Sequence, residues 1–470
     1  MKNALLQKVL SNMESYIEDI LKEERVVGCS IGVVRDQELI WFKGYGYSNI
    51  DKQTRPEAVT LFRGDSNTKP FTAMGIMQLR DEGKLDVNDP LIKHIPEFGR
   101  VSSRYGTIED VTLRRLLAHR SGLQGEPPSE RPRTGIGPTQ EELLNSLPEI
   151  GVVIPPDWQH KYCNLGFMLL GMVVSRLSGM EYEDYVREYI FRPLGMDSST
   201  FYPEESGVDR VIQYYGPEYQ ERAVEAMRLE LKSWIPAGGI YSNIDDMAKW
   251  ISLQFRTNID ITGDLQILKG SSIEEMHRPQ YLESDWSGGL CISWHALRSG
   301  DNVYLGHGGS NAGSNSQTYF NKRYKVGVIV FTNSDAHSAH NKISKEIMDQ
   351  CVEALSNIRE KPRASPITSA PSEIELLIGR YATDRPHSAM RIVWLDGTLM
   401  MVDGGESLPT DLVYRGGSGT PAHLDPTENA NVFMAREGRL AGETIIFKIG
   451  PDGKATGCTM QTGALYRRIR

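Results

Sequence analysis

The segment Gly64-Asp65-Ser66-Asn67-Thr68-Lys69-Pro70-Phe71 guides the interpretation of the whole chain, because it holds the only Ser-x-x-Lys sequence in 470 residues. Apolar residues recur with helical spacing over residues 70–85, so we predict a helix there, with Gly83 as its stop. Ser66 then lies at the first turn, and Lys69 lies on the same face of the helix. The same pattern also fits an N-cap serine followed by a surface lysine.

A serine and a lysine in this arrangement can carry out nucleophilic catalysis. A serine hydroxyl is a poor nucleophile at neutral pH unless a base lies beside it. A lysine amine can serve as that base when burial and neighbouring cations lower its pKa. The amides at a helix N-terminus can also stabilise a developing oxyanion. Ser66 and Lys69 therefore form a candidate catalytic pair.

The composition argues against several classes of function. The net charge of -9 disfavours nucleic acid or an anionic membrane as the main partner. No apolar run approaches the roughly 20 residues that span a bilayer. The first residues follow an amphipathic pattern, which predicts a folded helix rather than a signal peptide. The five cysteines are scattered and form no Cys-x-x-Cys pair, so we expect no disulfide framework, no metal, no other cofactor and a cytoplasmic location.

Three later segments supply further candidates. His119 ends a short predicted helix, and we interpret it as a core or capping histidine rather than a catalytic base. Tyr162 and Asn164 precede a predicted helix over residues 165–177, and in an extended segment both side chains point the same way. An asparagine there also fits a helix N-cap. The segment His307-Gly308-Gly309-Ser310 ends a predicted strand, where glycines let the backbone approach a ligand closely.

We predict two folded domains joined by a linker. Residues 361–372 are rich in proline and small polar residues, which is typical of a linker. Residues 1–360 mix predicted helices and strands, with three antiparallel strands expected over residues 289–332. Residues 373–470 contain short β-like runs broken by glycine, which predict a small antiparallel barrel or sandwich.

Three elements together resemble those of the class C β-lactamase and penicillin-recognising serine hydrolase family: Ser66-x-x-Lys69, Tyr162-x-Asn164 and His307-Gly308-Gly309, in this order. The resemblance covers about residues 10–358, and shorter stretches support it. These stretches are Leu116–Leu123, Pro193–Met196 and Pro236–Gly239. One departure is Asp157, where the family usually has a glycine.

The resemblance implies a mixed α/β fold in which an antiparallel sheet is flanked by helices and an all-helical lobe lies across the cleft. It implies that Ser66 is the acylated nucleophile and that Lys69 and Tyr162 share the proton transfers. Asn164 would orient Lys69 and the substrate amide. The backbone amides of Ser66 and Ser310 would form the oxyanion hole.

His307 stands where β-lactamases usually have the lysine of a Lys-Thr-Gly motif. A neutral imidazole is a poor partner for a substrate carboxylate at pH 7. A His-x-Gly motif resembles the D-aminopeptidase and esterase branches of the family. Those aminopeptidases, like some cyclases of nonribosomal peptides, carry C-terminal lipocalin-like β-domains. The resemblance therefore implies a serine hydrolase domain over residues 1–360 and a lipocalin-like domain over residues 373–470.

These observations favour a serine hydrolase that acts on small amide or ester substrates, with D-configured residues among the candidates. An acyltransferase or nonribosomal peptide cyclase that uses the same acyl-enzyme is an alternative. A non-catalytic binding protein that keeps the fold is a third hypothesis, and the presence of Ser66, Lys69 and Tyr162 argues against it. We expect a small-molecule or peptide substrate, and the sequence leaves a homo-oligomer open.

Overall fold

The computed structural model describes residues 2–128, 135–206, 211–216, 225–226, 229–257, 266–335, 338–357, 369–383, 389–395, 397–403, 422–436, 440–461 and 465–469. The chain divides into two compact units, Met1–Ile358 and Arg359–Arg470. No hydrophobic cluster of the described residues combines side chains from both units. The linker at residues 361–372 stays a prediction, because residues 361–368 lie outside the described part of the chain.

The first unit is built on one antiparallel sheet of eight strands in the order β2-β1-β12-β11-β10-β9-β8-β7. The strands are β1 (Gly28–Arg35), β2 (Glu38–Gly46), β7 (Tyr281–Leu282), β8 (Gly288–Leu290), β9 (His295–Ser299), β10 (Asn302–Asn311), β11 (Ser314–Asn321) and β12 (Val326–Thr332). The adjacent strands β1 and β12 are buried along nearly their whole length. Such continuous burial indicates that both faces of the sheet are covered.

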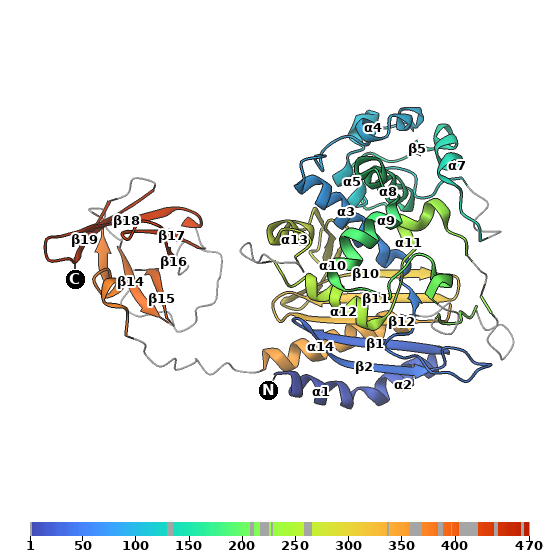
Figure 1. The fold of residues 1–470 in the computed structure, drawn as a ribbon, viewed down its shortest axis with the longest axis horizontal. Coiled ribbons are helices and arrows are strands. Elements are labelled where there is room, and N and C mark those ends of the chain that lie inside the picture. The colour runs from blue at the N-terminus through green and yellow to red at the C-terminus, as the bar shows by residue number, and fades with distance from the viewer. Residues whose placement is uncertain are drawn as a thin grey trace. The chain divides into compact units, whose positions relative to one another are not determined.

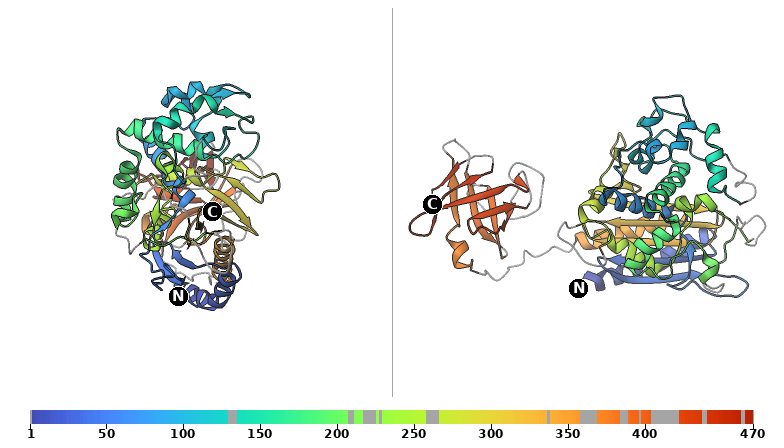
Figure 2. Two further views of the ribbon diagram at one scale, coloured as in Figure 1. Left: turned by 90° about the vertical axis from the view of Figure 1, so that its right-hand side faces the viewer. Right: turned by 45° about the horizontal axis from the view of Figure 1, so that its top comes forward.

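Helices cover the two faces of this sheet (Figures 1 and 2). On one face, α1 (Lys2–Asn12), α2 (Glu14–Glu23) and α14 (Ala339–Ser356) share a core with β1 and β12. Ile17 and Leu21 are the buried residues of α2, and its acidic residues lie elsewhere on the helix, as in an amphipathic surface helix. On the other face, α12 (Ile244–Leu253) belongs to a core that continues into the helical lobe.

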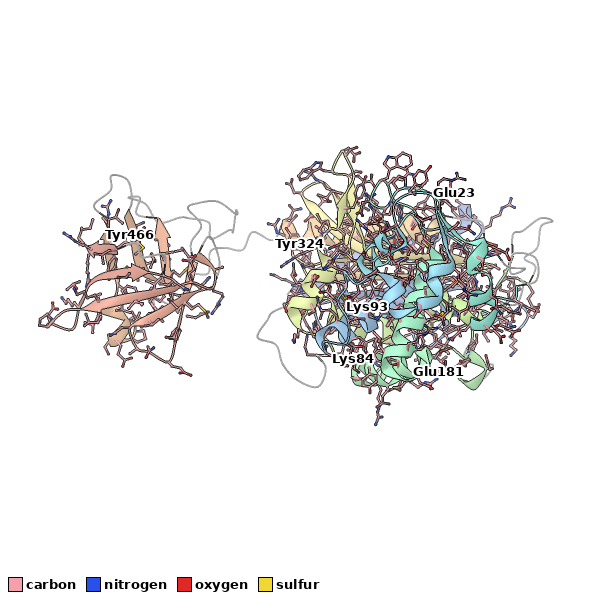
Figure 3. The ribbon with its side chains drawn as sticks, turned by 90° about the horizontal axis from the view of Figure 1, so that it is seen from above. Glu23, Lys84, Lys93, Glu181, Tyr324 and Tyr466 are labelled. Atoms are coloured by element: carbon pink, nitrogen blue, oxygen red, sulfur yellow. The ribbon has the colours of Figure 1, made fainter. Side chains whose placement is uncertain are left out.

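In the sequence, the helical lobe and its neighbouring helices lie between β2 and β7. The helices are α3 (Lys69–Asp81), α4 (Leu91–His94), α5 (Leu113–Leu117), α7 (Gln140–Asn145), α8 (Asn164–Ser178), α9 (Tyr182–Val186), α10 (Arg192–Leu194), α11 (Ile235–Gly238) and α13 (Gly270–His277). Short strands pair as β3 (Phe62–Arg63) with β6 (Tyr241–Ser242) and β4 (Ser102–Ser103) with β5 (Gly151–Val152). Helix α8 is buried from Leu165 to Val174 and packs against α3. Lys84 and Lys93 lie on the exposed side of the lobe (Figure 3).

The second unit is a closed barrel of eight antiparallel strands, each paired with its neighbours in sequence. After the short helix α15 (Ser372–Glu375), the strands are β13 (Gly379–Ala382), β14 (Ala389–Leu395), β15 (Thr398–Asp403), β16 (Ala422–Pro426), β17 (Val432–Ala435), β18 (Thr444–Ile449), β19 (Ala455–Met460) and β20 (Leu465–Arg468). The buried rings of Tyr381, Phe433 and Phe447 form successive edge contacts within its core. The expected mixed α/β fold with a C-terminal β-barrel is confirmed.

We predict that a chain ending at Arg363 folds and keeps Ser66 reactive, because the cores of the first unit include no barrel residue among those described. Circular dichroism and labelling by a fluorophosphonate probe measure the two properties. The full-length chain is the control. An unfolded or insoluble shortened chain would show that the two units depend on one another for stability.

Candidate active site

The Ser66 segment forms a tight turn that leads into α3. Residues Asp65–Thr68 make a 3-10 turn, and the α-helix starts at Lys69. Ser66 therefore lies in the turn before the helix rather than in the first α-helical turn. The helix ends at Asp81, earlier than predicted. Gly83 follows with a φ of 75°, the left-handed conformation that commonly terminates a helix.

Lys69 contacts the Ser66 hydroxyl in the interior of the first unit. Its Nζ donates to Ser66 Oγ at 3.0 Å and to the carbonyl oxygen of Ala237 at 2.7 Å. The ring centroids of Tyr162 and Phe167 lie 4.8 Å and 5.5 Å from the same Nζ. Lys69 is completely buried, so the alternative of a surface lysine is wrong.

Tyr162 is the third member of this group. It precedes α8, and its phenol forms a hydrogen bond with the Ser66 side chain. Burial raises the pKa of the Tyr162 phenol above its ordinary value, and the Ser66 hydrogen bond offsets this shift only in part. The phenol therefore keeps its proton at neutral pH. The structure thus places Ser66, Lys69 and Tyr162 in mutual contact.

Hydrogen bonds to β11 fix the turn that carries Ser66. Ser316 Oγ donates to the Gly64 carbonyl at 2.9 Å, and Asn67 Nδ2 donates to Ser316 Oγ at 2.9 Å. Thr318 Oγ1 donates to Asn67 Oδ1 at 2.8 Å. The three side chains are buried, where an unpaired polar group would be costly. Our sequence reasoning missed them, although the run of polar residues at the start of β11 was a signal.

The predicted strand that carries His307 is β10, and it lies against the Ser66 turn. A Cβ on Gly309 would lie 2.4 Å from the carbonyl oxygen of Gly64 and 2.9 Å from Cβ of Asp65. Only a glycine permits this approach of two backbones. Ser310, the next residue, is exposed at the end of the strand.

His307 is buried rather than displayed in an open cleft. Its Nδ1 lies 2.6 Å from the carbonyl oxygen of Gly308. Because a carbonyl only accepts, Nδ1 carries the proton and Nε2 is the unprotonated nitrogen. Burial, with His295 and Lys69 nearby, lowers the pKa of His307 well below its ordinary value of 6.5. The imidazole is uncharged at neutral pH.

Three histidines, His119, His160 and His307, lie against the Tyr162 ring, and His295 lies next to all three of them. Ring centroids lie 5.1 Å apart for His295 and His307, 5.9 Å for His160 and His295, and 5.9 Å for His119 and His160. His307 lies 6.4 Å from Tyr162 by the same measure. Burial lowers the pKa of His295 to about 4 and lowers the pKa of His160 to a smaller extent. At pH 7 these imidazoles are therefore uncharged polar groups close to Tyr162.

His119 holds Tyr162 in place. Its ring is stacked on the Tyr162 ring, with centroids 4.3 Å apart and planes inclined by 28°. The backbone amide of Cys163 donates to His119 Nδ1 at 3.0 Å, so this nitrogen has no proton. His119 is 2% exposed. The interpretation of His119 as a core histidine is confirmed, and its packing partner is Tyr162.

Asn164 is the first residue of α8 but does not cap it. The N-cap is Cys163, whose Sγ accepts from the Gly166 amide at 3.2 Å, so the alternative of an Asn164 N-cap is wrong. Asn164 Nδ2 donates instead to Glu126 Oε1 at 2.7 Å. The sequence did not indicate Glu126, because its segment lies in a loop without a motif.

Asp157 occupies a backbone position that suits a glycine. Its φ is 62°, in the left-handed region where aspartate is better tolerated than most residues. Its carboxylate accepts from Arg115 Nε at 2.8 Å. Asp157, in place of the usual glycine, therefore keeps the left-handed turn before Tyr162 and adds an ion pair with Arg115.

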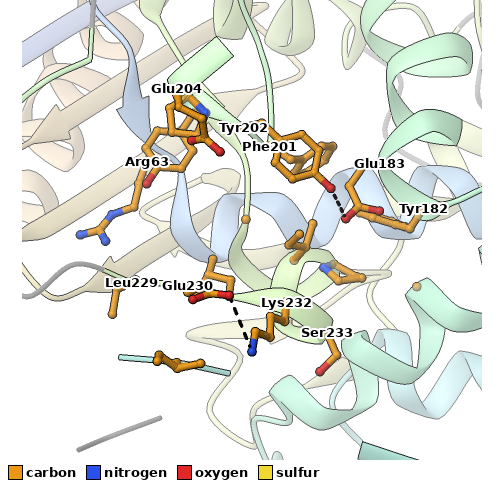
Figure 4. Close-up of a pocket in the computed structure, with 18 of the residues that line it drawn as sticks. Arg63, Tyr182, Glu183, Phe201, Tyr202, Glu204, Leu229, Glu230, Lys232 and Ser233 are labelled. Atoms are coloured by element: carbon orange, nitrogen blue, oxygen red, sulfur yellow. Dashed lines mark hydrogen bonds and ion pairs between the residues drawn. The ribbon is translucent and has the colours of Figure 1, made fainter. Parts of the chain in front are cut away.

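A cavity of about 1170 Å³ lies elsewhere in the first unit (Figure 4). Its walls include Arg63, Tyr182, Glu183 and Tyr202, and the Tyr202 hydroxyl donates to Glu183 Oε1 at 3.1 Å. None of Ser66, Lys69, Tyr162 and His307 lines it. The candidate catalytic side chains therefore lie outside the lining of this cavity.

Among the described residues, no three or more histidine, cysteine, aspartate or glutamate side chains are grouped so that they could hold a metal ion. None of their helices combines the length and the apolar character needed to cross a bilayer.

Comparison with known proteins identifies the family. Residues 13–349 match the family model described as beta-lactamase. The chain belongs to the beta-lactamase family.

Individual relatives of this beta-lactamase family member are distant. It is 27% identical to protein flp of Staphylococcus aureus over 243 residues, which are 52% of this chain and 48% of flp. The chain thus spans about half the length of that curated relative. An octameric penicillin-binding protein homologue from Pyrococcus abyssi matches 97% of this chain and 100% of its own, with a TM-score of 0.62 and 22% identity. A class C beta lactamase from Rhodobacter sphaeroides matches 73% of this chain and 98% of its own, with a TM-score of 0.60 and 18% identity. At these identities the two structures show the fold alone.

We predict that Gly309→Ala slows fluorophosphonate labelling of Ser66 strongly, because the new Cβ would meet the Gly64 backbone and displace the turn. Gly308→Ala is the matched control. Its Cβ would meet Oε1 of the Gln317 side chain, which can move aside. Equal labelling rates for the two variants would show that the approach of β10 does not position Ser66.

We predict that the stability of the first unit falls between pH 6.5 and about 4, because burial lowers the pKa of His295 to about 4. A histidine with a lowered folded-state pKa binds fewer protons when folded than when unfolded, so its contribution is complete above pH 6.5 and is lost on acidification. Thermal melts should show a smaller loss for His295→Gln than for the wild type. His423→Gln in the barrel is the control, and an unchanged slope in His295→Gln would contradict the prediction.

Proposed function

We propose that the protein is a serine hydrolase that forms an acyl-enzyme at Ser66 on small amide or ester substrates. The observation that best supports this proposal is the contact of Ser66 with both Lys69 and Tyr162. Because the hydroxyl has two proton-transfer partners, one of them can take its proton during the attack and the other can protonate the leaving group.

The steps assigned to these residues conserve protons. In its neutral form, Lys69 takes the Ser66 proton as Oγ attacks the substrate carbonyl carbon. Tyr162, a protonated phenol at rest, gives its proton to the leaving nitrogen or oxygen and regains one from Lys69. Water then attacks the acyl-enzyme, and the same groups run in reverse to release the acid and restore Ser66. The Ala237 carbonyl, 2.7 Å from Lys69 Nζ, orients the amine throughout.

The amides of Ser66 and Ser310 would hold the oxyanion that forms in each step. The close approach of Gly309 to the Gly64 carbonyl supports this assignment, because it brings the end of β10 beside the nucleophile turn. Backbone amides fixed in this way stabilise charge without reorganising during the reaction.

The uncharged His307 favours substrates without a carboxylate at this position. A buried imidazole with a lowered pKa offers no positive charge at pH 7. We therefore prefer aminopeptidase-like or esterase-like activity, including activity on D-configured residues, over β-lactam hydrolysis. The aminopeptidase and esterase types are also the ones that the His-x-Gly motif resembles.

We further propose a homo-oligomer in a reducing compartment such as the cytoplasm. The octameric Pyrococcus abyssi homologue, which matches almost the whole chain, supports the first part. The second part is supported by the five cysteines, all of which are unpaired and buried. Light scattering coupled to size exclusion would determine the number of subunits.

We predict that Ser66→Ala abolishes covalent labelling by a fluorophosphonate probe. Lys69→Ala and Tyr162→Phe should each slow labelling by about 100-fold, the range of lost general acid-base catalysis. Ser11→Ala, an exposed serine on α1, is the control and should label at the wild-type rate. Full labelling of Ser66→Ala, with the adduct mapped to another residue, would refute the assignment.

A further inference from the structure

Two side chains of α3, one turn apart on the same face of the helix, reach consecutive carbonyls of α11. Lys69 Nζ donates to the Ala237 carbonyl at 2.7 Å, and Thr72 Oγ1 donates to the Pro236 carbonyl at 2.6 Å. Thr72 is completely buried. The carbonyl that orients the Lys69 amine is therefore next, along the chain, to a carbonyl that Thr72 holds.

Tyr182 on α9 completes this chain of hydrogen bonds. Its hydroxyl lies 2.7 Å from Thr72 Oγ1. The single hydroxyl proton of Thr72 goes to the Pro236 carbonyl, because a carbonyl only accepts, so Tyr182 is the donor to Thr72. Burial raises the pKa of the Tyr182 phenol above its ordinary value, and the phenol keeps the proton that it donates. The hydrogen bonds thus run in one direction, from Tyr182 through Thr72 to Pro236.

Packing and hydrogen bonding hold different parts of Pro236. Its ring lies against α8, where a Cβ on Gly171 would come within 2.1 Å of Pro236 Cγ. This contact fixes the ring, whereas the Thr72 hydroxyl sets the direction of the Pro236 carbonyl. An unpaired carbonyl in the interior is costly, so without that hydroxyl the peptide after Pro236 would turn toward another donor. Such a turn moves the adjoining backbone of Ala237.

The direction of the Ala237 carbonyl matters for the reaction at Ser66. A neutral amine carries one lone pair, which must point at the Ser66 hydroxyl to take its proton. Ser66 Oγ lies 3.0 Å from Lys69 Nζ. The N–H that donates to Ala237 sets the rotation of the amine and so directs the lone pair. A displaced Ala237 carbonyl would therefore misalign the base even though Lys69 itself is intact.

We propose that Thr72 and Tyr182 are positioning residues for the reaction at Ser66, because they fix the Ala237 carbonyl and through it the Lys69 amine. This inference rests on the proposed function of Ser66 as the acylated nucleophile. In this role neither side chain exchanges a proton with the substrate, and both act through the backbone of α11.

The first test compares two replacements of Thr72. Thr72→Val keeps the shape of the side chain but removes the hydroxyl, whereas Thr72→Ser keeps the hydroxyl. Fluorophosphonate labelling of Ser66 should slow by about ten-fold in Thr72→Val, less than for loss of Lys69, because the base remains but is misaligned. Thr72→Ser should label within about two-fold of the wild-type rate, because its hydroxyl restores the alignment.

The time course of labelling separates positioning from stability. A positioning defect lowers the rate constant of labelling, while the final labelled fraction stays complete. Loss of the fold lowers that final fraction instead. We expect Thr72→Val to show the first behaviour.

Tyr182→Phe has a matched control on the same helix. Tyr185 is also buried on α9, and its hydroxyl donates to Gln78 Oε1 on α3 at 3.2 Å. Tyr182→Phe and Tyr185→Phe each remove one buried phenol hydroxyl between α9 and α3, but only the Tyr182 hydroxyl leads to Pro236. Labelling should slow by about three-fold in Tyr182→Phe, where Thr72 keeps its bond to Pro236 but loses its own donor, and should be unchanged in Tyr185→Phe.

The double variant Thr72→Val/Tyr182→Phe tests whether the two hydroxyls belong to one chain. It should label at the rate of Thr72→Val alone, because the first change already interrupts the chain that the second would weaken. Slowing that multiplies the two single effects would show that the hydroxyls act independently and would refute the chain.

The outcomes are distinguishable from failure of the proposed function. If the wild type is labelled at Ser66 and Thr72→Val labels at the same rate, or Thr72→Ser is as slow as Thr72→Val, the positioning role is refuted and the hydrolase assignment stands. Equal rates for Tyr182→Phe and Tyr185→Phe also refute it, and this comparison remains as the test if Thr72→Val does not fold. If the wild type itself is not labelled at Ser66, the proposed function fails and the positioning role fails with it.

Discussion

The position of the Ser66 hydroxyl depends on the hydrogen bonds that join its turn to β11. Ser316 donates to the Gly64 carbonyl, and Asn67 connects Ser316 to Thr318. These groups are buried, so any shift of the turn along the strand would leave polar atoms unpaired in the interior. The junction therefore fixes the register between the Ser66 turn and the sheet, and β10 can approach only because Gly309 has no side chain.

The electrostatics around this junction follow from burial. Lys69 is enclosed by two aromatic rings and the Ala237 carbonyl, and the neighbouring imidazoles are uncharged at neutral pH. The Glu126 carboxylate, by contrast, is exposed, so solvent and salt screen its charge.

The described cores of the two units are built from different residues. Each described hydrophobic cluster belongs to one unit alone, and the barrel core is filled by rings such as those of Tyr381 and Phe447. Its eight strands follow one another in sequence, and the short β-like runs in the sequence predicted a small antiparallel barrel or sandwich, of which the structure has the barrel.

The sequence alone determined the features that depend on local spacing. A separation of three residues brings Lys69 beside Ser66 in a helical turn, and short β-rich runs predict the strands. Only the tertiary structure decided which distant side chains surround that pair. Ala237, Ser316 and Glu126 come from segments far apart in the chain, and no spacing in the sequence encodes the distances between them. Burial decided the rest, because the charge states of the histidines near Tyr162 depend on desolvation, which exists only once the sheet and the helical lobe have packed together.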